Sequence, residues 1–214
     1  MTDSATDGRV QKGNETRRMI VARTVQIASI EGLSGLSLGR LATDLGVSKS
    51  GVFALFGSKE ELQLATVRAA QAIYIQKVIE PALETPSGIA RVYRLCECWL
   101  EYSRTRVFPG GCFFFAANSE FDAQPGRIRD ELAKSSLAWE RTVEGMLEIA
   151  RAVGEINSDT DVAQVAFELI SFMEAANAGS LLHDEPVAPY RRASRAILHR
   201  LRTVATDPTL LPSP

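Results

Sequence analysis

The chain of 214 residues has few of the side chains on which metal and disulfide chemistry depend. It contains three cysteines and two histidines. The cysteines, Cys96, Cys98 and Cys112, do not form the even-numbered framework of a small secreted domain. His183 and His199 lie far from them in sequence, whereas a structural zinc site needs four well-placed ligands. We therefore expect no metal and no other cofactor. Buried, small apolar side chains are the expected role of the cysteines, and a redox-sensing thiol is the alternative.

Long apolar runs are also missing. No run reaches the ~18 residues that a transmembrane helix needs, and residues 1–14 lack the apolar segment of a signal peptide. A cytoplasmic protein is therefore expected. A di-metal enzyme built on a helical bundle would need Glu-x-x-His pairs, and the sequence contains none. We therefore expect no enzyme.

Strand-like alternation of apolar and polar residues is absent, and apolar residues recur at helical spacing instead. At 45% hydrophobic residues, the chain can bury a sizeable core. The pattern predicts an all-α fold. Helices are expected at residues 16–31, from residue 58 to about 81, and at residues 89–106, 113–121, 128–153, 161–182 and 190–204.

Residues 37–62 carry the signals of two short helices joined by a tight turn. Ser37 suits an N-cap, because its hydroxyl can accept a hydrogen bond from a backbone N–H of the first turn. Gly46 suits the end of that helix, where a left-handed residue costs little, and Val47 can anchor the turn in the core. The apolar positions of the first helix are Leu38, Leu41, Ala42 and Leu45.

A second helix is expected after Ser48, which can cap it in turn. Gly57 ends this helix, and Ser58 with Glu61 forms a capping box for the next one. Its apolar face is expected to consist of Val52, Phe53 and Phe56. This layout is that of a DNA-binding helix-turn-helix, which places its second helix in the major groove. Periodicity alone leaves an ordinary antiparallel helix pair open.

Charge is unevenly distributed along the chain. The segment from Arg9 to Lys59 holds eight basic and three acidic residues, which gives it a charge of +5. Because the net charge of the chain is −2, the remaining residues carry a charge of −7. A basic head on an acidic body is the asymmetry expected of a module that approaches phosphates at one end.

Residues 15–70 resemble the DNA-binding domain of the TetR/AcrR family of bacterial transcriptional regulators. The resemblance rests on three stretches at the spacing of the family: Leu41-Ala42, the run from Leu45 to Lys49 (LGVSK), and the run from Phe56 to Leu62 (FGSKEEL). Residues 108–131 resemble one C-terminal subgroup of the same family. The resemblance implies about nine helices. An N-terminal three-helix domain would bind DNA, and a C-terminal domain would bind an effector and dimerise.

The expected reading surface departs from the family pattern. Phe53 stands where the family usually has tyrosine, and Ala54 and Leu55 stand where histidines are frequent. We expect Lys49 to contact a guanine edge and apolar side chains to contact thymine methyl groups. Serine hydroxyls, the other basic side chains and helix N-termini would contact phosphates. The residues expected at DNA are Ser37, Arg40, Ser48, Lys49, Ser50, Gly51, Phe53, Ala54 and Lys59.

The last two long helices point to self-association. Residues 161–182 are apolar nearly all round, and such a helix needs burial on more than one side. In the family, these two helices of each subunit form a four-helix bundle, so the resemblance implies a homodimer and a palindromic operator. The core of a monomer is the alternative. The residues expected at the interface are Val165, Leu169, Phe172, Ala176, Ile197 and Leu201.

Three consecutive aromatic residues, Phe113 to Phe115, cannot all face one side of a helix. Some of them could line a cavity with other large side chains of the body. Such a mostly apolar pocket suits a small hydrophobic or aromatic effector, and ordinary core packing is the alternative. The candidate pocket consists of Tyr93, Cys96, Trp99, Cys112, Phe114, Phe115, Trp139, Phe172, Met173 and Asn177.

The sequence thus predicts four parts: a disordered tail at residues 1–14, a DNA-binding domain at 15–62, an effector and dimerisation domain at 63–206, and a frayed tail at 207–214. The predicted function is a sequence-specific regulator of transcription. We expect a repressor that a small apolar effector releases from a palindromic operator in double-stranded DNA. An activator, or a protein-interaction module with weak DNA binding, is the alternative.

Overall fold

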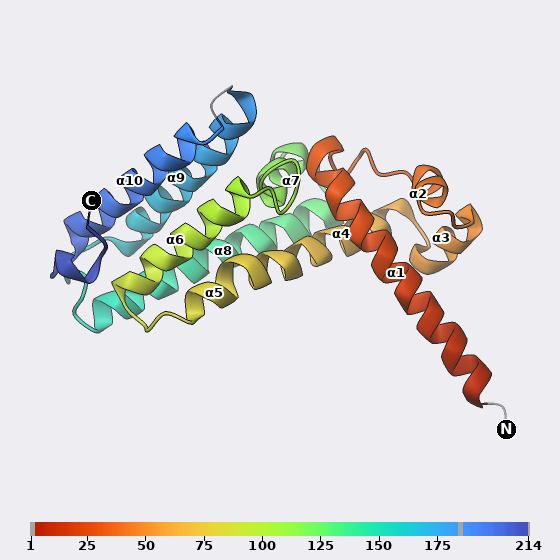
Figure 1. The fold of residues 1–214 in the computed structure, drawn as a ribbon, viewed down its shortest axis with the longest axis horizontal. Helices are drawn as coiled ribbons and strands as arrows, with labels where there is room; N and C mark the ends of the chain where they lie inside the picture. Colours follow the sequence, from red (N-terminus) through yellow and green to blue (C-terminus); the bar gives the residue numbers. More distant parts are fainter. Residues whose placement is uncertain (1–2, 184–185, 214) are drawn as a thin grey trace. The chain divides into compact units, whose positions relative to one another are not determined.

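A computed structural model describes residues 3–183 and 186–213, with backbone only for residues 3–10 and Lys12. Within these ranges the chain is helical, apart from an isolated bridge between Ile156 and Ala205. The elements are α1 (Asp3–Glu31), α2 (Leu38–Asp44), α3 (Lys49–Phe56), α4 (Lys59–Tyr74), π-helical η1 (Ile75–Ile79), α5 (Glu80–Leu83), α6 (Ile89–Arg104), α7 (Phe113–Phe121), α8 (Arg127–Ala152), α9 (Val162–Leu182), α10 (Ala188–Val204) and the 3₁₀ turn η2 (Pro208–Leu210) (Figure 1). The all-α fold is as predicted.

Both chain ends are more regular than the sequence predicted. Helix α1 begins at Asp3, so it covers most of the expected disordered tail; Met1 and Thr2 lie outside the described residues. Residues 3–14 contain no proline, and extending an existing helix costs far less than starting one. At the other end, η2 follows α10 and Leu211 is buried, so residues 207–213 are not frayed.

Contacts divide the chain into two compact units. The N-terminal unit consists of residues 1–72 and 108–132, and the C-terminal unit of residues 73–107 and 133–214. This division differs from the predicted boundaries, because α7 and the start of α8 belong with the DNA-binding helices rather than with the body. Contacts between segments so far apart in the sequence leave no local pattern, and helical periodicity therefore could not reveal them.

The core of the N-terminal unit is formed by the leucine-rich connection after α1 and by the buried faces of α2, α3 and α4. Its fully buried members include Leu33, Leu36, Leu41, Val52 and Leu62. Two buried hydroxyls, those of Thr24 and Thr66, lie 2.7 Å apart and join α1 to α4. The buried amide of Gln63 donates to the carbonyl of Leu33 at 2.9 Å. These polar groups are therefore satisfied inside the core, as burial requires.

The segment that contains α7 is bound to the end of α1 within the N-terminal unit. Gly110 donates its N–H to the Ser29 hydroxyl at 3.2 Å, and a Cβ at Gly110 would lie 1.7 Å from the Ser29 carbonyl oxygen. The Glu120 carboxylate accepts from the backbone N–H groups of Leu33 and Ser34 at 2.7 and 2.8 Å. Only glycine allows the close approach at position 110, and the carboxylate satisfies two N–H groups of the connection that follows α1.

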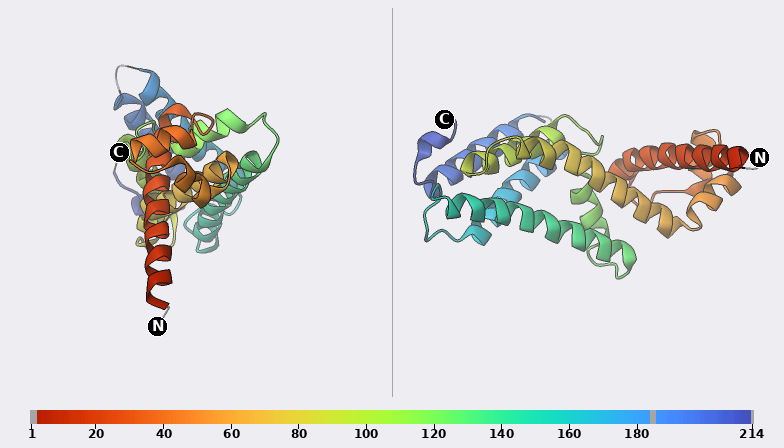
Figure 2. Two further views of the ribbon diagram at one scale, coloured as in Figure 1. Left: turned by 90° about the vertical axis from the view of Figure 1, so that its right-hand side faces the viewer. Right: turned by 90° about the horizontal axis from the view of Figure 1, so that it is seen from below.

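In the C-terminal unit, α9 and α10 run side by side (Figure 2) and both pack on α6. The core between them is apolar and includes Leu95, Cys96, Leu169, Met173 and Leu201, all completely buried. Among the described residues, α9 alone is long and apolar enough to span a membrane by composition. A core helix passes the same test, and core packing accounts for the apolar side of α9.

The helix that starts at Lys59 passes through a π-helical turn before it ends at Leu83. Pro81 has no N–H to donate to the carbonyl four residues earlier, and its ring would clash with that carbonyl in a regular α-helix. The wider turn at Ile75–Ile79 lies directly before this proline. The sequence predicted a helix to about Pro81, and the wider turn lets it continue to Leu83.

Replacing Glu120 by glutamine should destabilise the protein. Glutamine keeps one acceptor oxygen, so one of the two N–H groups loses its partner, and the other loses a charge-assisted bond. We expect the free energy of unfolding, measured by urea denaturation, to fall by about 1–3 kcal/mol. Asp122→Asn is the matched control, because its exposed carboxylate makes no such contact. Equal stabilities of the two variants would contradict this role.

Candidate nucleic-acid interface and effector region

Helices α2 and α3 form the predicted helix-turn-helix, and the caps and turn lie where the sequence placed them. The hydroxyl of Ser37 accepts from the N–H of Arg40 at 3.5 Å, and that of Ser48 accepts from the N–H of Gly51 at 3.0 Å. Gly46 has φ = 64° and so provides the left-handed turn residue. The N–H of Val47 then bonds the carbonyl of Ala42 at 2.9 Å and closes the turn.

A single face of α3 is exposed. Val52 and Phe56 are buried, as expected of the apolar face. Phe53, which was expected on the same face, is 56% exposed instead. The N-terminal end of α3 presents Ser48, Lys49 and Ser50 to the solvent, followed by Ala54; Gly51 is half-buried. Six of the nine residues expected at DNA therefore lie together on α3 and its cap, on the side opposite the core.

Helix α1 holds the C-terminal end of α3 through one arginine that the sequence reading missed. The Arg17 guanidinium donates to the Leu55 carbonyl at 2.7 Å and lies 4.7 Å from the centre of the Phe56 ring. A cation at the end of a helix also interacts favourably with its free carbonyl groups. Arg17 therefore fixes α3 against α1, although no local motif marks an arginine for such a contact.

Two of the predicted phosphate contacts are engaged within the protein. The Arg40 guanidinium forms a two-pronged ion pair with the Glu31 carboxylate at the end of α1, and hydrogen bonding to Arg40 lowers the pKa of Glu31. The Lys59 ammonium donates to the Ser34 carbonyl at 2.5 Å. Ser37, by contrast, is exposed at the N-terminus of α2. Arg40 and Lys59 thus brace the connection between α1 and α2.

The ten candidate pocket residues are divided between the two units. Cys112, Phe114 and Phe115 belong to the N-terminal unit, and the other seven belong to the C-terminal unit. Tyr93, Cys96, Trp99, Met173 and Asn177 are buried there, and Trp139 and Phe172 are half-buried. The Trp139 ring meets the Tyr74 ring edge-on, with the ring centres 5.4 Å apart.

Four of the six candidate interface residues are core residues of one chain. Val165, Leu169, Ile197 and Leu201 are at most 1% exposed, so the same chain covers them. The prediction was wrong for these four, because apolar spacing shows that a helix face is buried but not which element covers it. Phe172 and Ala176 are the exceptions, since both line a groove at the surface.

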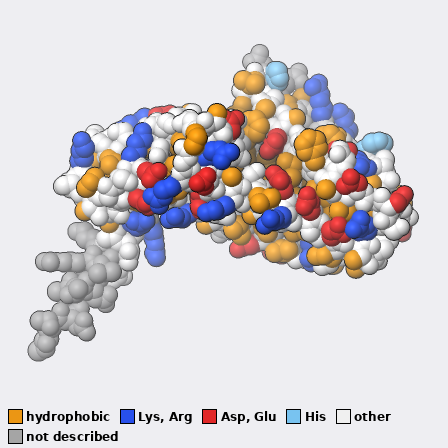
Figure 3. Space-filling view, turned by 180° about the vertical axis from the view of Figure 1, so that it is seen from behind, with side chains coloured by type: hydrophobic (Ala, Val, Ile, Leu, Met, Phe, Trp, Pro, Cys, Tyr) orange, Lys and Arg blue, Asp and Glu red, His pale blue; other side chains and the backbone are white. Residues whose placement is uncertain are grey.

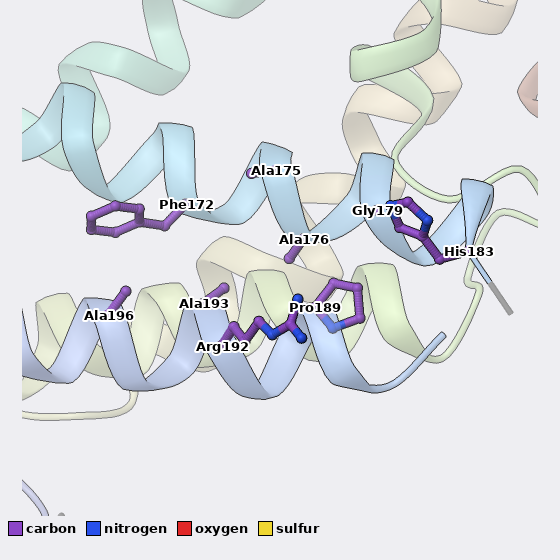
Figure 4. A pocket seen from close by; sticks show the side chains of 9 residues that line it. All are labelled: Phe172, Ala175, Ala176, Gly179, His183, Pro189, Arg192, Ala193 and Ala196. Carbon is purple, nitrogen blue, oxygen red and sulfur yellow. The ribbon is translucent and has the colours of Figure 1, made fainter. Parts of the chain in front are cut away.

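A surface groove of 310 Å³ separates the outer faces of α9 and α10. We call it the Phe172 groove. Phe172, Ala175, Ala176, Gly179 and the capping His183 line it from α9, and Pro189, Arg192, Ala193 and Ala196 line it from α10. Figure 4 shows Ala175, Ala176 and Ala193, together with Arg192 and Pro189, between Phe172 and His183. The outer side of α9 also exposes Phe167 and Leu182, by 66% and 81%. On the face drawn in Figure 3, hydrophobic side chains appear on the C-terminal unit among charged ones.

A buried polar cluster in the C-terminal unit joins α6, α9 and α10. The Tyr190 hydroxyl lies 2.8 Å from the Ser103 hydroxyl and 2.9 Å from that of Ser180, and Ser103 also donates to the Asn177 side-chain oxygen. The Arg106 guanidinium donates to Tyr190 at 3.3 Å and to the Ser180 carbonyl at 3.1 Å. Sequence reasoning missed this cluster, because four of its members are common polar residues spread over 87 positions.

The three cysteines are buried. Burial raises the pKa of the Cys96 thiol to about 12 and also raises the pKa of Cys98. Oxidation proceeds through the thiolate, and the raised pKa of both residues disfavours that form. Their environment is that of buried apolar side chains and not that of redox sensors.

Comparisons with known proteins agree with this geometry. The family model described as "Bacterial regulatory proteins, tetR family" matches residues 20–66, and the one described as "Tetracyclin repressor-like, C-terminal domain" matches residues 88–197, just over half of the chain. Among curated proteins, no sequence matches the chain significantly.

Solved structures of low sequence identity share the fold. A TetR transcriptional regulator from Chloroflexus aurantiacus is 22% identical, with a TM-score of 0.84 over 91% of this chain and 98% of its own. A putative transcriptional regulator from Saccharomonospora viridis, in complex with choline, is 19% identical (TM-score 0.74, 91% and 100%). AibR, in complex with isovaleryl coenzyme A and operator DNA, is 13% identical (TM-score 0.68, 88% and 97%). The helix-turn-helix and the two family matches together show that the chain belongs to the TetR family of bacterial transcriptional regulators.

Proposed function

We propose that this DNA-binding regulator is a repressor that reads a palindromic operator with α3 and leaves it when an effector binds. The observation that carries the proposal is the exposed face of α3, which presents Lys49, Ser50, Phe53 and Ala54 while Val52 and Phe56 anchor the helix below. A short helix held in this way can enter the major groove end-on. Selection of bound sequences from random DNA tests the proposal, and a two-fold symmetric consensus is the expected result.

Base recognition would depend on few groups. Lys49 can donate to the N7 and O6 atoms of a guanine, and the exposed ring of Phe53 can contact a thymine methyl group. Ser37, Ser48 and Ser50 stand at helix starts, where hydroxyl and backbone N–H groups suit phosphate oxygens. Gly51 and Ala54 let the DNA approach the helix closely, since neither carries a long side chain.

Arg40 and Lys59 would contribute phosphate contacts only after exchanging their partners in the protein. Exposed ion pairs such as Arg40 with Glu31 contribute little net stability, so a phosphate can compete with the Glu31 carboxylate. DNA binding would then transfer Arg40 from the end of α1 to the operator backbone. Lys59 can exchange the Ser34 carbonyl in the same way.

The proposed homodimer forms through the outer faces of α9 and α10. The Phe172 groove offers small side chains that let a second helix approach closely, and the exposed Phe167 extends the apolar surface beside it. A two-fold interface places the same patch of both copies in contact. This face replaces the four buried residues that the sequence suggested, and Phe172 and Ala176 remain part of it.

The proposed effector is a small, mostly apolar molecule that enters the C-terminal unit among Tyr93, Trp99, Trp139 and their neighbours. It can release the operator only through a difference in its affinity for two states of the dimer. We place the protein in the cytoplasm, where operator and effector would both be available. The same DNA and effector binding could also serve an activator, because the position of the operator decides whether the bound protein activates or represses transcription.

A protein-interaction module with weak DNA binding is the second candidate function. The exposed Phe53 and the internally paired Arg40 favour it, because both reduce the free polar groups of the reading surface. The affinity for random DNA at increasing salt separates the two candidates. A steep decline indicates phosphate contacts, and a flat profile favours the interaction module.

Lys49→Ala should relax the base preference. We expect the selected operator to lose about 1–3 kcal/mol of its advantage over a site altered at the guanine, because the bidentate contact is gone. Binding curves on the two sites measure this difference, with Lys77→Ala on the C-terminal unit as the control. Equal weakening on both sites would mean that Lys49 contacts only phosphate.

Glu31→Gln should strengthen DNA binding, since it frees Arg40 for a phosphate. The slope of log affinity against log salt should steepen by about 0.9, the value of one added phosphate contact. Glu15→Gln removes the same charge from the same helix and should leave the slope unchanged. Identical slopes for both variants would show that Arg40 braces α1 and makes no contact with DNA.

Ala175→Glu should shift the protein toward monomers. It would bury an unpaired carboxylate in the Phe172 groove, at a cost of several kcal/mol. Sedimentation velocity checks the molecular mass. Ala138→Glu, at an exposed position of α8, is the control and should stay dimeric. A dimeric Ala175→Glu protein would exclude this face as the interface.

A further inference from the structure

A second groove, on the side of α10 that faces α6, has a volume of 620 Å³. We call it the arginine groove. Its charged lining consists of Arg94, Glu97, Glu101 and Arg104 from α6 and Arg191 and Arg195 from α10. The volume falls within the range of small-molecule sites, about 300–1,000 Å³.

The arginine groove carries an excess of positive charge. Its four arginines face two glutamates, so its formal charge is +2 in a chain of net charge −2. Arg104 pairs with Glu101 at 2.5 Å and Arg94 lies 3.9 Å from Glu97. Arg191 and Arg195 form no ion pair with any described residue. Two guanidinium groups one helical turn apart are therefore available to an anion.

The same groove has an apolar lining. Leu100 comes from α6, and Val187 and the ring of Tyr190 come from the start of α10. Val187 is 47% exposed, whereas Leu100 and Tyr190 are 7% and 4% exposed. The arginine groove thus places two guanidinium groups beside the exposed side chain of Val187, which an apolar group would cover.

Tyr190 connects the groove to the buried polar cluster. Its ring lines the groove, while its hydroxyl bonds Ser103, Ser180 and Arg106 in the interior. Arg106 has φ = 54°, a left-handed conformation that a residue with a side chain adopts only when its surroundings hold it. Its contacts with Tyr190 and Ser180 supply that restraint, directly before the chain leaves the C-terminal unit at Phe108.

We propose that the arginine groove is a binding site for a small amphipathic organic anion, with a carboxylate or phosphate held by Arg191 and Arg195 and an apolar part on Leu100, Val187 and Tyr190. Planar guanidinium groups bind both kinds of anion through paired hydrogen bonds. A bare inorganic anion would leave the apolar lining uncovered. A nucleic acid strand would need a continuous basic path, whereas Glu97 and Glu101 interrupt this one.

The position of Tyr190 gives the site a regulatory role, a step that depends on the proposed function. An anion that contacts the Tyr190 ring would alter the hydrogen bonds by which its hydroxyl holds Arg106. Arg106 restrains the end of α6, and the residues that follow it lead into the segment of α7 in the N-terminal unit. The bound anion would therefore change operator affinity through the conformation of residue 106.

Calorimetric titration of the full-length protein with octyl phosphate and octanoate tests the binding site. Octanol and inorganic phosphate serve as the comparison, because each carries only one of the two recognised features. We expect either or both octyl anions to bind. Octanol and phosphate should bind at least about tenfold more weakly, because octanol lacks the charged hydrogen-bonding group and phosphate lacks the apolar chain.

The double variant Arg191→Ala/Arg195→Ala should weaken anion binding at least about tenfold. Arg141→Ala/Lys77→Ala removes two exposed positive charges from the same unit outside the groove and should bind as the unmodified protein does. Arg191→Lys/Arg195→Lys keeps the positive charges but loses the paired hydrogen bonds of the guanidinium groups, so its affinity should lie between those of the alanine variant and the unmodified protein. Failure of both octyl anions to bind, or equal affinities of the two alanine double variants, would overturn the proposal.

Tyr190→Phe tests the coupling separately. The ring remains, so octyl-anion binding should persist, while the effect of the anion on operator affinity should be lost. Thermal melting first confirms that the variant is folded. If it is not, Arg106→Gly provides the same test, because glycine adopts φ = 54° without restraint. A retained anion effect on DNA binding in the folded variant would refute the coupling, and a protein without operator affinity would refute the proposed function alone.

Discussion

The Glu120 carboxylate accepts hydrogen bonds from two backbone N–H groups just beyond the end of α1. Gly110, ten residues before Glu120, approaches α1 closely at the Ser29 carbonyl. These contacts fix residues 108–121 to the helix that also carries Arg17 and Glu31. Through these two side chains, α1 contacts the end of α3 and Arg40 of α2. The second helix of the helix-turn-helix is therefore held by α1, whose end is bound by a segment from the middle of the chain.

This arrangement gives a physical form to communication within the protein. The chain passes from the C-terminal unit into residues 108–132 and then returns, so a change at the end of α6 or in α8 reaches α1 through covalent connections. No long path of side-chain contacts is required. Bistability would need only two conformations of the residues at these crossings. The left-handed Arg106 stands two residues before Phe108, whose side chain is fully buried.

The helix-turn-helix could be predicted from the sequence because its signals are local. Ser37, Ser48 and Ser58 each accept a hydrogen bond from the backbone N–H three residues later, and Gly46 has the expected left-handed conformation. The interface residues on α9 and α10 could not be predicted in the same way. Helical spacing identifies Leu169 and Leu201 as buried, but a partner subunit and another helix of the same chain give an identical pattern. The placement of α7 and the contact of Arg17 with α3 likewise depend on residues distant in sequence.

The π-helical turn at Ile75–Ile79 has a consequence for the long helix that contains it. Leu62, Thr66, Ala70, Tyr74, Val78 and Ala82 are all buried and stand at a constant interval of four residues. In a regular α-helix, each interval of four overshoots a full turn by about 40°, so the first and last of these side chains would end on different sides. A π-helical turn contains more residues than an α-helical turn, so it reverses part of this rotation of the buried face. The buried residues therefore stay closer to one face of the helix. A simple four-residue period in the sequence then suffices for residues of this helix to be buried in both units.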